Sequence, residues 1–169
     1  DVIPDEYNPY PQPTHNIFKG DFVTCNDVLG KLLEPDTSND LSHKSYSKAK
    51  FLANGSQGQT EINMEGLSPT IRSEHHGNIE FRRLSAEHGG RNSKELNEGK
   101  KERRLSPREC ALIQTFPPDF PFVFYKPYMK KYSVSPSNAY KVIGNAVPPM
   151  LAFNLAKRIE EVWPLYFGE

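Results

Sequence analysis

The stretch from Tyr140 to Pro149 constrains the fold of this 169-residue chain more than any other part of its sequence. It reads Tyr-Lys-Val-Ile-Gly-Asn-Ala-Val-Pro-Pro. Gly144 can adopt the left-handed conformation that ends a helix, and Pro148 and Pro149 preset the backbone dihedral angle of a new first turn. We therefore expect one helix to end at about residue 143, a second to begin at 148, and an exposed corner between them.

The chemistry of this corner suits a small polar ligand with a flat aromatic part. Asn145, Ala146 and Val147 would offer free backbone N–H groups, one side-chain amide and a small apolar surface. An ordinary helix-loop-helix corner is the alternative, because Gly, Asn and Pro often mark such loops. The corner alone does not distinguish a binding site from a plain turn, so its sequence context matters.

A second motif lies upstream, where residues 103–117 read Arg-Arg-Leu-Ser-Pro-Arg-Glu-Cys-Ala-Leu-Ile-Gln-Thr-Phe-Pro. Ser106 is a good helix cap, Pro107 suits the first helical position, and Glu109 follows the cap by three residues. Together they form a capping box, in which two side chains satisfy free N–H groups at the start of the helix. This pattern predicts a helix over about residues 107–115.

These two motifs, in this order and at this separation, resemble the last two sequence motifs of the DNA cytosine-5 methyltransferases. The likeness is strongest over residues 103–162 and more piecemeal upstream. It implies an α+β chain in which a small, irregular, strand-rich lobe precedes a C-terminal helical segment that would pack on an absent α/β methyltransferase domain. Residues 1–18 would be an extended connector, residues 19–104 the target recognition lobe, and residues 105–169 the helical motifs that return to the catalytic domain.

The resemblance implies double-stranded DNA and S-adenosylmethionine as ligands, and methyl transfer to C5 of cytosine. Asn145, Ala146 and Val147 would line one wall of the cofactor pocket, which the missing domain would complete. The family's catalytic thiolate lies in a Pro-Cys-Gln segment, and the sequence contains neither that segment, nor Glu-Asn-Val, nor a Gly-rich turn after a first strand. We therefore expect no catalytic residue here and no activity from the chain alone.

The cysteines and histidines add no competing chemistry. Cys25 lies at an expected helix start, where the helix dipole can lower a thiol pKa, but no catalytic-loop pattern surrounds it. Cys110 is expected to pack as a small buried hydrophobe. The five histidines show no metal-ligand spacing, so no metal site is predicted.

The resemblance also places candidate DNA contacts in the lobe. The family's recognition region is marked by a Thr followed by Leu, Ile or Val after a Gly-rich loop, and Thr70 precedes Ile71 after the loop at residues 55–60. By analogy with members whose loop glutamine fills the hole left by a flipped cytosine, Gln57 would enter the DNA, with Thr60 beside the base-reading position and Thr70 near a phosphate. An amide offers both a donor and an acceptor to the orphaned guanine. A loop without such a role remains the alternative.

Arginine side chains suit guanine edges and phosphates, so Arg72, Arg82 and Arg83 are further candidate DNA contacts, although alternate strand positions can simply face water. The formal net charge is zero, but residues 72–108 carry ten basic against six acidic side chains. Such a segment can follow a phosphate backbone. Its Lys-Glu-rich part, residues 93–103, could equally be a solvated surface loop.

Turn residues and hydrophobic periodicity predict the other elements. Residues 3–15, spaced by prolines, should be extended. Thr24 and Asp27 should form a capping box at the start of a helix whose apolar face reaches Leu33 and which Pro35 stops. An irregular stretch should follow over residues 36–50. Short strands are expected at residues 51–52, 66–72 and 78–84, with a turn at His75-His76-Gly77. Helices are expected at about residues 107–115, 136–143 and 148–163.

The last helix carries an apolar stripe, which consists of Leu151, Leu155, Ile159 and Val162. If the catalytic domain is separate, this stripe is exposed and predicts self-association or a need for a partner. An excised domain of a longer enzyme and the small subunit of a split enzyme both fit, and a stand-alone DNA-binding or regulatory module is the rival from another class. The chain has no membrane-length apolar run and starts without Met, which suggests a fragment or processed product of an intracellular protein. The family resemblance implies a bacterial cytoplasmic protein associated with the nucleoid.

Overall fold

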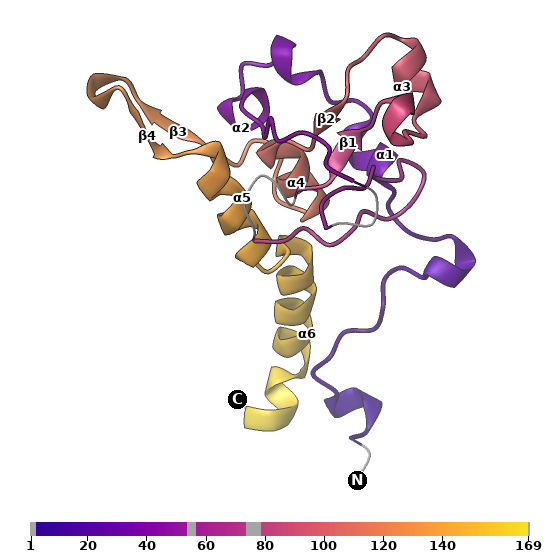
Figure 1. Ribbon diagram of the computed structural model, residues 1–169. Coiled ribbons are helices and arrows are strands. Elements are labelled where there is room, and N and C mark those ends of the chain that lie inside the picture. Colours follow the sequence, from indigo (N-terminus) through magenta and orange to yellow (C-terminus); the bar gives the residue numbers. More distant parts are fainter. Residues whose placement is uncertain (1–2, 54–56, 74–78, 169) are drawn as a thin grey trace. The chain divides into compact units, whose positions relative to one another are not determined.

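A computed structural model describes residues 3–53, 57–73 and 79–168 of the chain (Figure 1). The chain divides into two compact units, and each is described by itself. Unit 1 comprises Asp1–Phe22 and Val147–Glu169, and unit 2 comprises Val23–Ala146. These boundaries differ from the three segments expected from the sequence, because residues 105–146 belong to the same compact unit as most of the expected recognition lobe.

Unit 2 mixes short helices with two small antiparallel sheets, as expected for an α+β chain. Its α-helices are α1 (Cys25–Leu29), α2 (Leu41–Lys44), α3 (Ser93–Asn97), α4 (Pro107–Ile113) and α5 (Pro136–Asn145). Its 3-10 turns are η3 (Pro35–Thr37), η5 (Ala86–His88) and η6 (Pro127–Met129). Strand β1 (Phe81–Arg83) pairs with β2 (Arg103–Arg104), and β3 (Phe124–Lys126) pairs with β4 (Lys131–Val134).

Both predicted capping boxes are confirmed. At α4, the Ser106 hydroxyl accepts a hydrogen bond from Glu109 N at 3.1 Å, and Glu109 accepts one from Ser106 N at 2.8 Å. At α1, Thr24 and Asp27 make the same reciprocal pair. These bonds satisfy N–H groups that have no partner within the helix, which is why both helices begin where local sequence predicts.

Helix α4 lies at the centre of the hydrophobic core of unit 2. Cys110 and Ala111 are fully buried and pack in one cluster with Tyr140 and Ile143 of α5. The Tyr140 hydroxyl donates to Leu105 O at 2.7 Å and accepts from the backbone N–H of Ser47 at 3.1 Å, so its polar end is paired within the core. Burial raises the pKa of the Cys110 thiol well above its usual value, in keeping with an inert packing residue.

The expected lobe is irregular but not rich in strands. Of the three predicted strands, only the third contains a strand among the described residues, β1, and the other two adopt irregular backbone. Helix α1 ends at Leu29, before Leu33, and η3 and α2 lie in the stretch expected to be irregular. The segment expected to be a solvated loop includes α3. The predicted turn at His75-His76-Gly77 lies outside the described residues.

The two expected helices form with a break between them, but the first ends at Asn145, two residues later than expected, and a left-handed Gly144 does not end it. Helix α5 continues through Gly144 to Asn145, and Gly144 does not have a positive φ. A Cβ atom on Gly144 would lie 2.2 Å from Arg72 C and 2.3 Å from Ser73 N. Glycine is therefore required because the backbone at residues 72–73 crosses the helix at van der Waals contact, and not because the helix ends there.

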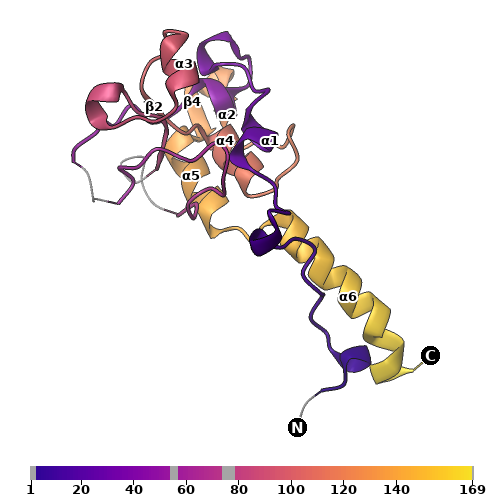
Figure 2. The same ribbon diagram turned by 90° about the vertical axis from the view of Figure 1, so that its right-hand side faces the viewer.

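Unit 1 consists of the N-terminal segment and helix α6 (Pro149–Phe167), with 3-10 turns η1 (Asp5–Tyr7) and η2 (Ile17–Lys19). The N-terminal segment runs beside α6 (Figure 2). Arg158 donates from Nε to Asn8 O at 2.9 Å, and the ring of Tyr7 meets that of Tyr166 edge-on at 5.9 Å. No described helix is long and apolar enough to cross a lipid bilayer.

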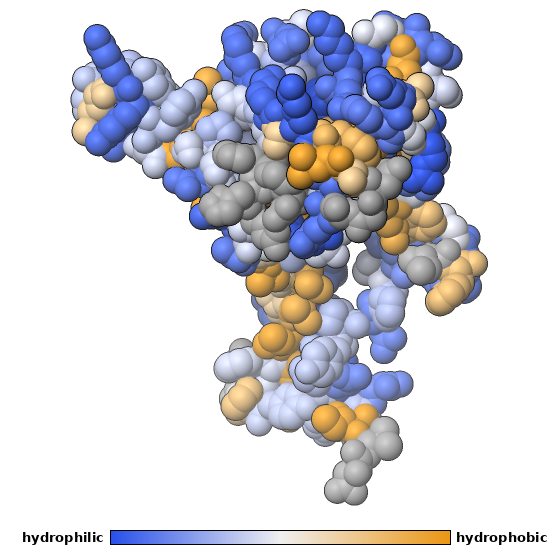
Figure 3. Space-filling view, in the orientation of Figure 1, coloured by the Kyte–Doolittle hydropathy of each residue, from blue (hydrophilic) through white to orange (hydrophobic). Residues whose placement is uncertain are grey.

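The apolar stripe expected on this helix is only partly exposed. Leu151 and Ile159 are exposed and Leu155 is half-buried, but Val162 is 3% exposed and thus covered. Helix α6 also exposes apolar side chains outside the expected stripe, including Phe153 and Trp163. Figure 3 shows hydrophobic atoms along this helix.

Candidate functional site

The structure brings three of the predicted DNA-contacting residues together around Glu80. Thr60 donates from both its backbone N–H and its hydroxyl to Glu80 Oε2, at 3.0 and 2.7 Å. Arg72 Nη1 lies 3.6 Å from Glu80 Oε1. In the amide orientation that satisfies both groups, the Gln57 oxygen accepts from Arg72 Nε at 3.1 Å and from Nη1 at 3.2 Å. Thr70 is exposed on the segment that leads into Arg72.

Arg104 organises the backbone around this cluster. Its guanidinium donates to four carbonyl oxygens: Ala49 at 2.7 Å, Lys50 at 3.0 Å, Gly58 at 2.5 Å, and Ile79. One buried side chain thus ties together the segments on either side of the Gly-rich loop and the start of β1. Burial lowers the pKa of Arg104 and the charge of Glu80 opposes this change, while guanidinium groups remain charged in proteins.

These side-chain bonds explain why the lobe forms so little sheet. Gln59, which is 2% exposed, accepts a hydrogen bond from Leu52 N at 2.9 Å through its side-chain oxygen. Several backbone groups on either side of the loop are thus paired with the side chains of Gln59 and Arg104, so they do not need a neighbouring strand as partner. Gly58 has a φ of 68°, a left-handed conformation that a bulkier residue would adopt at a cost.

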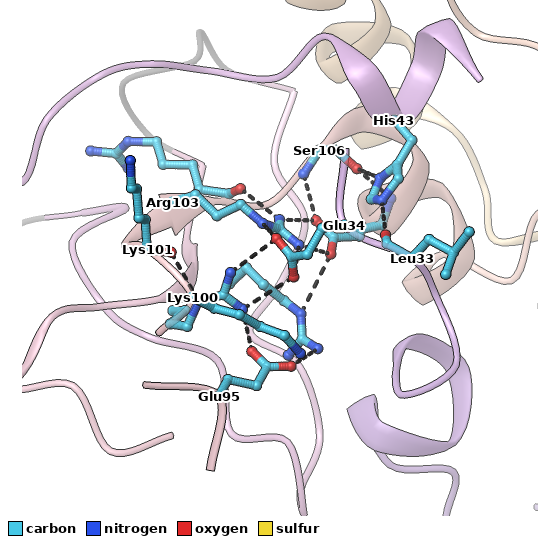
Figure 4. A network of polar contacts seen from close by, with 12 residues as sticks. Leu33, Glu34, His43, Glu95, Lys100, Lys101, Arg103 and Ser106 are labelled. Carbon is cyan, nitrogen blue, oxygen red and sulfur yellow. Dashed lines mark hydrogen bonds and ion pairs between the residues drawn. The ribbon is translucent and has the colours of Figure 1, made fainter. Parts of the chain in front are cut away.

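Arg82 and Arg83 do not face solvent. They are 4% and 1% exposed and belong to an ion-pair network with Arg103 and three glutamates, Glu34, Glu95 and Glu109 (Figure 4). Arg103 binds Glu109 through two parallel bonds of 2.8 and 2.9 Å and reaches Glu34 at 2.9 Å. Because the guanidinium groups of Arg82 and Arg83 are buried and paired with glutamates inside unit 2, neither is available to contact DNA in this structure.

Burial of arginines also reduces the positive charge that residues 72–108 expose to solvent. Five of its ten basic side chains are buried: Arg82, Arg83, Arg103, Arg104 and Arg108. Arg108 pairs with Asp40 at 2.5 Å. Half of the basic side chains of this segment are therefore held inside unit 2 and are not available to phosphates.

His43 is a structural residue that the sequence did not reveal. Its Nε2 lies 2.6 Å from Leu33 O, and its Nδ1 lies 2.7 Å from the hydroxyl of Ser106, the cap of α4. Because a carbonyl only accepts, Nε2 carries the hydrogen and Nδ1 accepts from the hydroxyl (Figure 4). No sequence spacing signals this contact, since His43 and Ser106 are far apart in the chain.

The charges of the network make the stability of unit 2 dependent on pH. Burial alone would raise the pKa of Glu34, but hydrogen bonds and charge from Arg103 and then Arg83 lower it to about 2. The folded-state pKa thus lies below the unfolded value of about 4.3, so this stabilisation is complete above about pH 5 and is lost as the pH falls toward 2. Burial likewise raises and Arg103 lowers the pKa of Glu109, with a net decrease.

We expect the urea midpoint of unfolding to fall more steeply between pH 5 and 3 in the wild-type chain than in Glu34→Gln, which has no carboxylate at this position to protonate. Between pH 5 and 3, the wild type should lose on the order of 1–2 kcal/mol more of its free energy of unfolding than the variant. The loss is no larger because Glu34 is partly exposed and solvent screens the pair. Glu65→Gln, which removes an exposed carboxylate with no ion pair to any described residue, should follow the wild type. Parallel pH profiles for wild type and Glu34→Gln would contradict this role.

The predicted cofactor residues lie where α5 ends. Asn145 is the last residue of α5 and is exposed, and its side-chain amide makes no hydrogen bond within the described part of the chain. Ala146 is half-buried, and its N–H donates to Ile143 O at 3.1 Å, so the expectation that this N–H is free is wrong. Val147, described with unit 1, is 61% exposed. Residues 3–53, 57–73 and 79–168 contain no group of three or more side chains that could hold a metal ion.

A model of the C-5 cytosine-specific DNA methylases matches residues 4–161, which is nearly the whole chain. The chain belongs to the C-5 cytosine-specific DNA methylase family. It is 51% identical over 59 residues to the type II methyltransferase M.FnuDI of Fusobacterium nucleatum, which is 35% of this chain and 14% of that protein. Over 165 residues it is 28% identical to the type II methyltransferase M.BsuRI of Bacillus subtilis, which is 95% of this chain and 36% of that protein.

A third relative is shorter than these two. The type II methyltransferase M.AquIB of Picosynechococcus sp. is 40% identical over 62 residues, which is 36% of this chain and 44% of that protein. Each of these alignments spans less than half of the relative's own length.

C-5 cytosine methylases use S-adenosylmethionine as methyl donor, and the residues at the end of α5 fit part of such a pocket. The Asn145 amide provides two donors and one acceptor that no described residue occupies. Ala146 and Val147 provide small apolar surface. The Ala146 N–H does not contribute, since Ile143 already accepts from it.

Proposed function

We propose that this chain supplies DNA recognition and one wall of the cofactor pocket in a DNA cytosine-5 methyltransferase, which transfers a methyl group from S-adenosylmethionine to C5 of cytosine in a specific sequence. Membership of the C-5 cytosine-specific DNA methylase family carries this proposal. The names of M.FnuDI and M.BsuRI, both type II methyltransferases, agree with it. The enzyme would act on DNA in the bacterial cytoplasm.

The proposed recognition element is the cluster of Gln57, Thr60 and Arg72, with Thr70 beside it. Gln57 is exposed and Arg72 is half-buried, so both side chains are accessible to a ligand. Glu80, which is buried, accepts a hydrogen bond from Thr60 and forms an ion pair with Arg72. A flipped cytosine leaves its guanine without a partner, and an amide paired with an arginine can offer both donors and acceptors to that base. Arg104 acts as a positioning residue, because it fixes the backbone on both sides of Gln57.

The proposed catalytic centre lies in another polypeptide segment, because this sequence has no Pro-Cys-Gln nucleophile motif. That segment would belong either to the same longer chain or to a second chain, and both arrangements place the exposed apolar side chains of α6 against the catalytic domain. Burial of such a surface favours association. Without the partner segment, the same surface would favour self-association.

The proposed cofactor wall consists of Asn145, Ala146 and Val147. S-adenosylmethionine supplies the methyl group, and these residues would bind and orient it without taking part in the chemistry. The Asn145 side chain would replace hydrogen bonds that the ligand makes with water, and the small side chains of Ala146 and Val147 would allow a flat ring to approach.

In the complete enzyme, Asn145→Ala is expected to weaken S-adenosylmethionine binding about tenfold, since one hydrogen bond contributes about 1 kcal/mol and an unpaired partner adds to the loss. Calorimetric titration measures this change, and sequencing of methylated DNA should give an unchanged target. Asn138→Ala, which also removes an exposed amide from α5, serves as the control and should bind the cofactor normally. A shifted target sequence with unaltered cofactor affinity would refute the assignment of Asn145.

A further inference from the structure

The hairpin of β3 and β4 is an exposed element that neither the recognition cluster nor the end of α5 uses. It projects from the rest of unit 2 in Figure 1, and every residue from Phe124 to Ser133 is exposed. Its chain position is between α4 and α5, the helices of the two family motifs. Side chains on this hairpin are therefore available to a ligand of the unit that carries the proposed recognition cluster.

The hairpin concentrates positive charge. Lys126 of β3 lies directly opposite Lys131 of β4, and Lys130 precedes Lys131 at a φ of 50°. Like charges opposite each other destabilise a hairpin, and a non-glycine residue in the left-handed region adds strain. The sequence has no Asp or Glu between Asp119 and Glu160, so no nearby residue in the chain offsets this charge. Figure 3 shows the projecting hairpin as largely hydrophilic.

Aromatic side chains accompany these lysines. Tyr125 and Tyr132 face each other across the strands with their rings 5.1 Å apart, and Tyr128 is 80% exposed at the turn. Tyrosine hydroxyls and lysine ammonium groups are common donors to phosphate oxygens. Three lysines without an ion pair to any described residue, interleaved with three tyrosines on a projecting ribbon, have the chemistry of a nucleic-acid contact.

We propose that the β3–β4 hairpin is a second DNA contact, which grips the phosphate backbone of the duplex outside the bases that the recognition cluster reads. This inference rests on the proposed function, because it takes double-stranded DNA as the ligand. Positive charge interleaved with tyrosine hydroxyls suits the phosphates of DNA, which is the ligand of the proposed function. Lysine acts as a mobile point charge without the planar fork of arginine, so the hairpin strengthens binding without selecting a sequence.

The test replaces Lys126, Lys130 and Lys131 together with glutamine in the complete enzyme. Binding is measured between about 50 and 200 mM salt, on a duplex that contains the methylated sequence and on one that lacks it. Raising the salt from about 50 to about 200 mM lowers the affinity of the wild type by a certain factor. For each lysine that no longer neutralises a phosphate, this factor should be about threefold smaller in the variant. We expect affinity to fall equally for both duplexes, with the target sequence unchanged.

Two further variants control for charge and folding. Replacement of the three lysines by arginine keeps the charge and should retain the wild-type salt dependence. Replacement of three exposed lysines elsewhere in unit 2, Lys31, Lys44 and Lys94, by glutamine removes the same net charge and should change the salt dependence much less. Thermal unfolding of all variants establishes that the hairpin changes leave the fold intact.

The outcomes separate this proposal from the proposed function. If the wild-type enzyme neither binds nor methylates DNA, the proposed function fails and the hairpin proposal falls with it. If the wild type does both and the glutamine variant keeps its salt dependence, the hairpin proposal alone is refuted. Loss of assembly with the catalytic segment, or capture of an acidic protein with no change in DNA binding, would also overturn it by assigning the hairpin another occupant.

Discussion

Replacement of Glu109 with alanine is expected to destabilise unit 2 by about 3–5 kcal/mol, because it leaves buried positive charge without its partner. Glu109 is 1% exposed and accepts two hydrogen bonds from Arg103 and one from Ser106 N. Its other ion-pair neighbour, Arg82 Nε, lies 3.4 Å away and has no hydrogen-bond partner in the described structure. The substitution therefore removes the acceptor of Ser106 N in the capping box of α4 and a central carboxylate of the ion-pair network.

Urea denaturation of the chain measures this loss, with the wild type and Glu87→Ala in parallel. Glu87 is exposed and has no ion pair to another described residue, so its replacement should leave the midpoint close to that of the wild type. Glu109→Gln, which keeps an acceptor for Ser106 N but not the charge, should lie between the two. A Glu109→Ala variant within about 1 kcal/mol of the wild type would show that the network does not stabilise the unit.

Local sequence predicted the features that depend only on near neighbours. The capping boxes at Thr24 and Ser106 follow from side chains three residues apart, and both form as expected. Helix α4 follows from its cap and first-turn proline in the same way. The family resemblance, which rests on the same motif and on the one at Tyr140–Pro149, is confirmed over residues 4–161.

Features that depend on distant partners could not be predicted. The alternating pattern around Arg82 and Arg83 is typical of a strand with one solvated face. Both arginines are instead buried, and they form ion pairs with Glu34, Glu95 and Glu109. Nothing in the sequence near β1 identifies these glutamates as partners. A polar residue on a strand is exposed only when no distant charge pairs with it, and that is decided by the tertiary fold.

Other features also have physical causes that the local sequence does not reveal. A glycine at position 144 is compatible both with the end of a helix and with a backbone segment that crosses the helix closely. Only the position of residues 72–73 in the fold shows that the second reason applies. The β3–β4 hairpin lacks the Asn-Gly or Asp-Gly turn that marks many hairpins, and it turns instead through η6 and a left-handed Lys130. The placement of Gln57 beside Arg72 depends likewise on the carbonyl contacts of Arg104.

We propose that this chain recognises DNA and binds the cofactor but depends on another segment for catalysis. Attack on C6 of cytosine needs an activated thiolate, and neither Cys25 nor Cys110 provides one, since burial raises the pKa of both thiols. Without the nucleophile, no covalent intermediate with cytosine can form. The expected loss in the rate of methyl transfer is therefore larger than the loss caused by removing any single contact of Gln57, Arg72 or Asn145.

Transfer of labelled methyl groups from S-adenosylmethionine to duplex DNA tests this claim most directly. We expect no transfer by the 169-residue chain alone. We expect methylation at C5 of cytosine when the segment that carries the Pro-Cys-Gln nucleophile is supplied, either in one longer chain or as a second chain. Methyl transfer by the isolated chain, or an assembled protein that binds DNA without methylating C5 of cytosine, would contradict it.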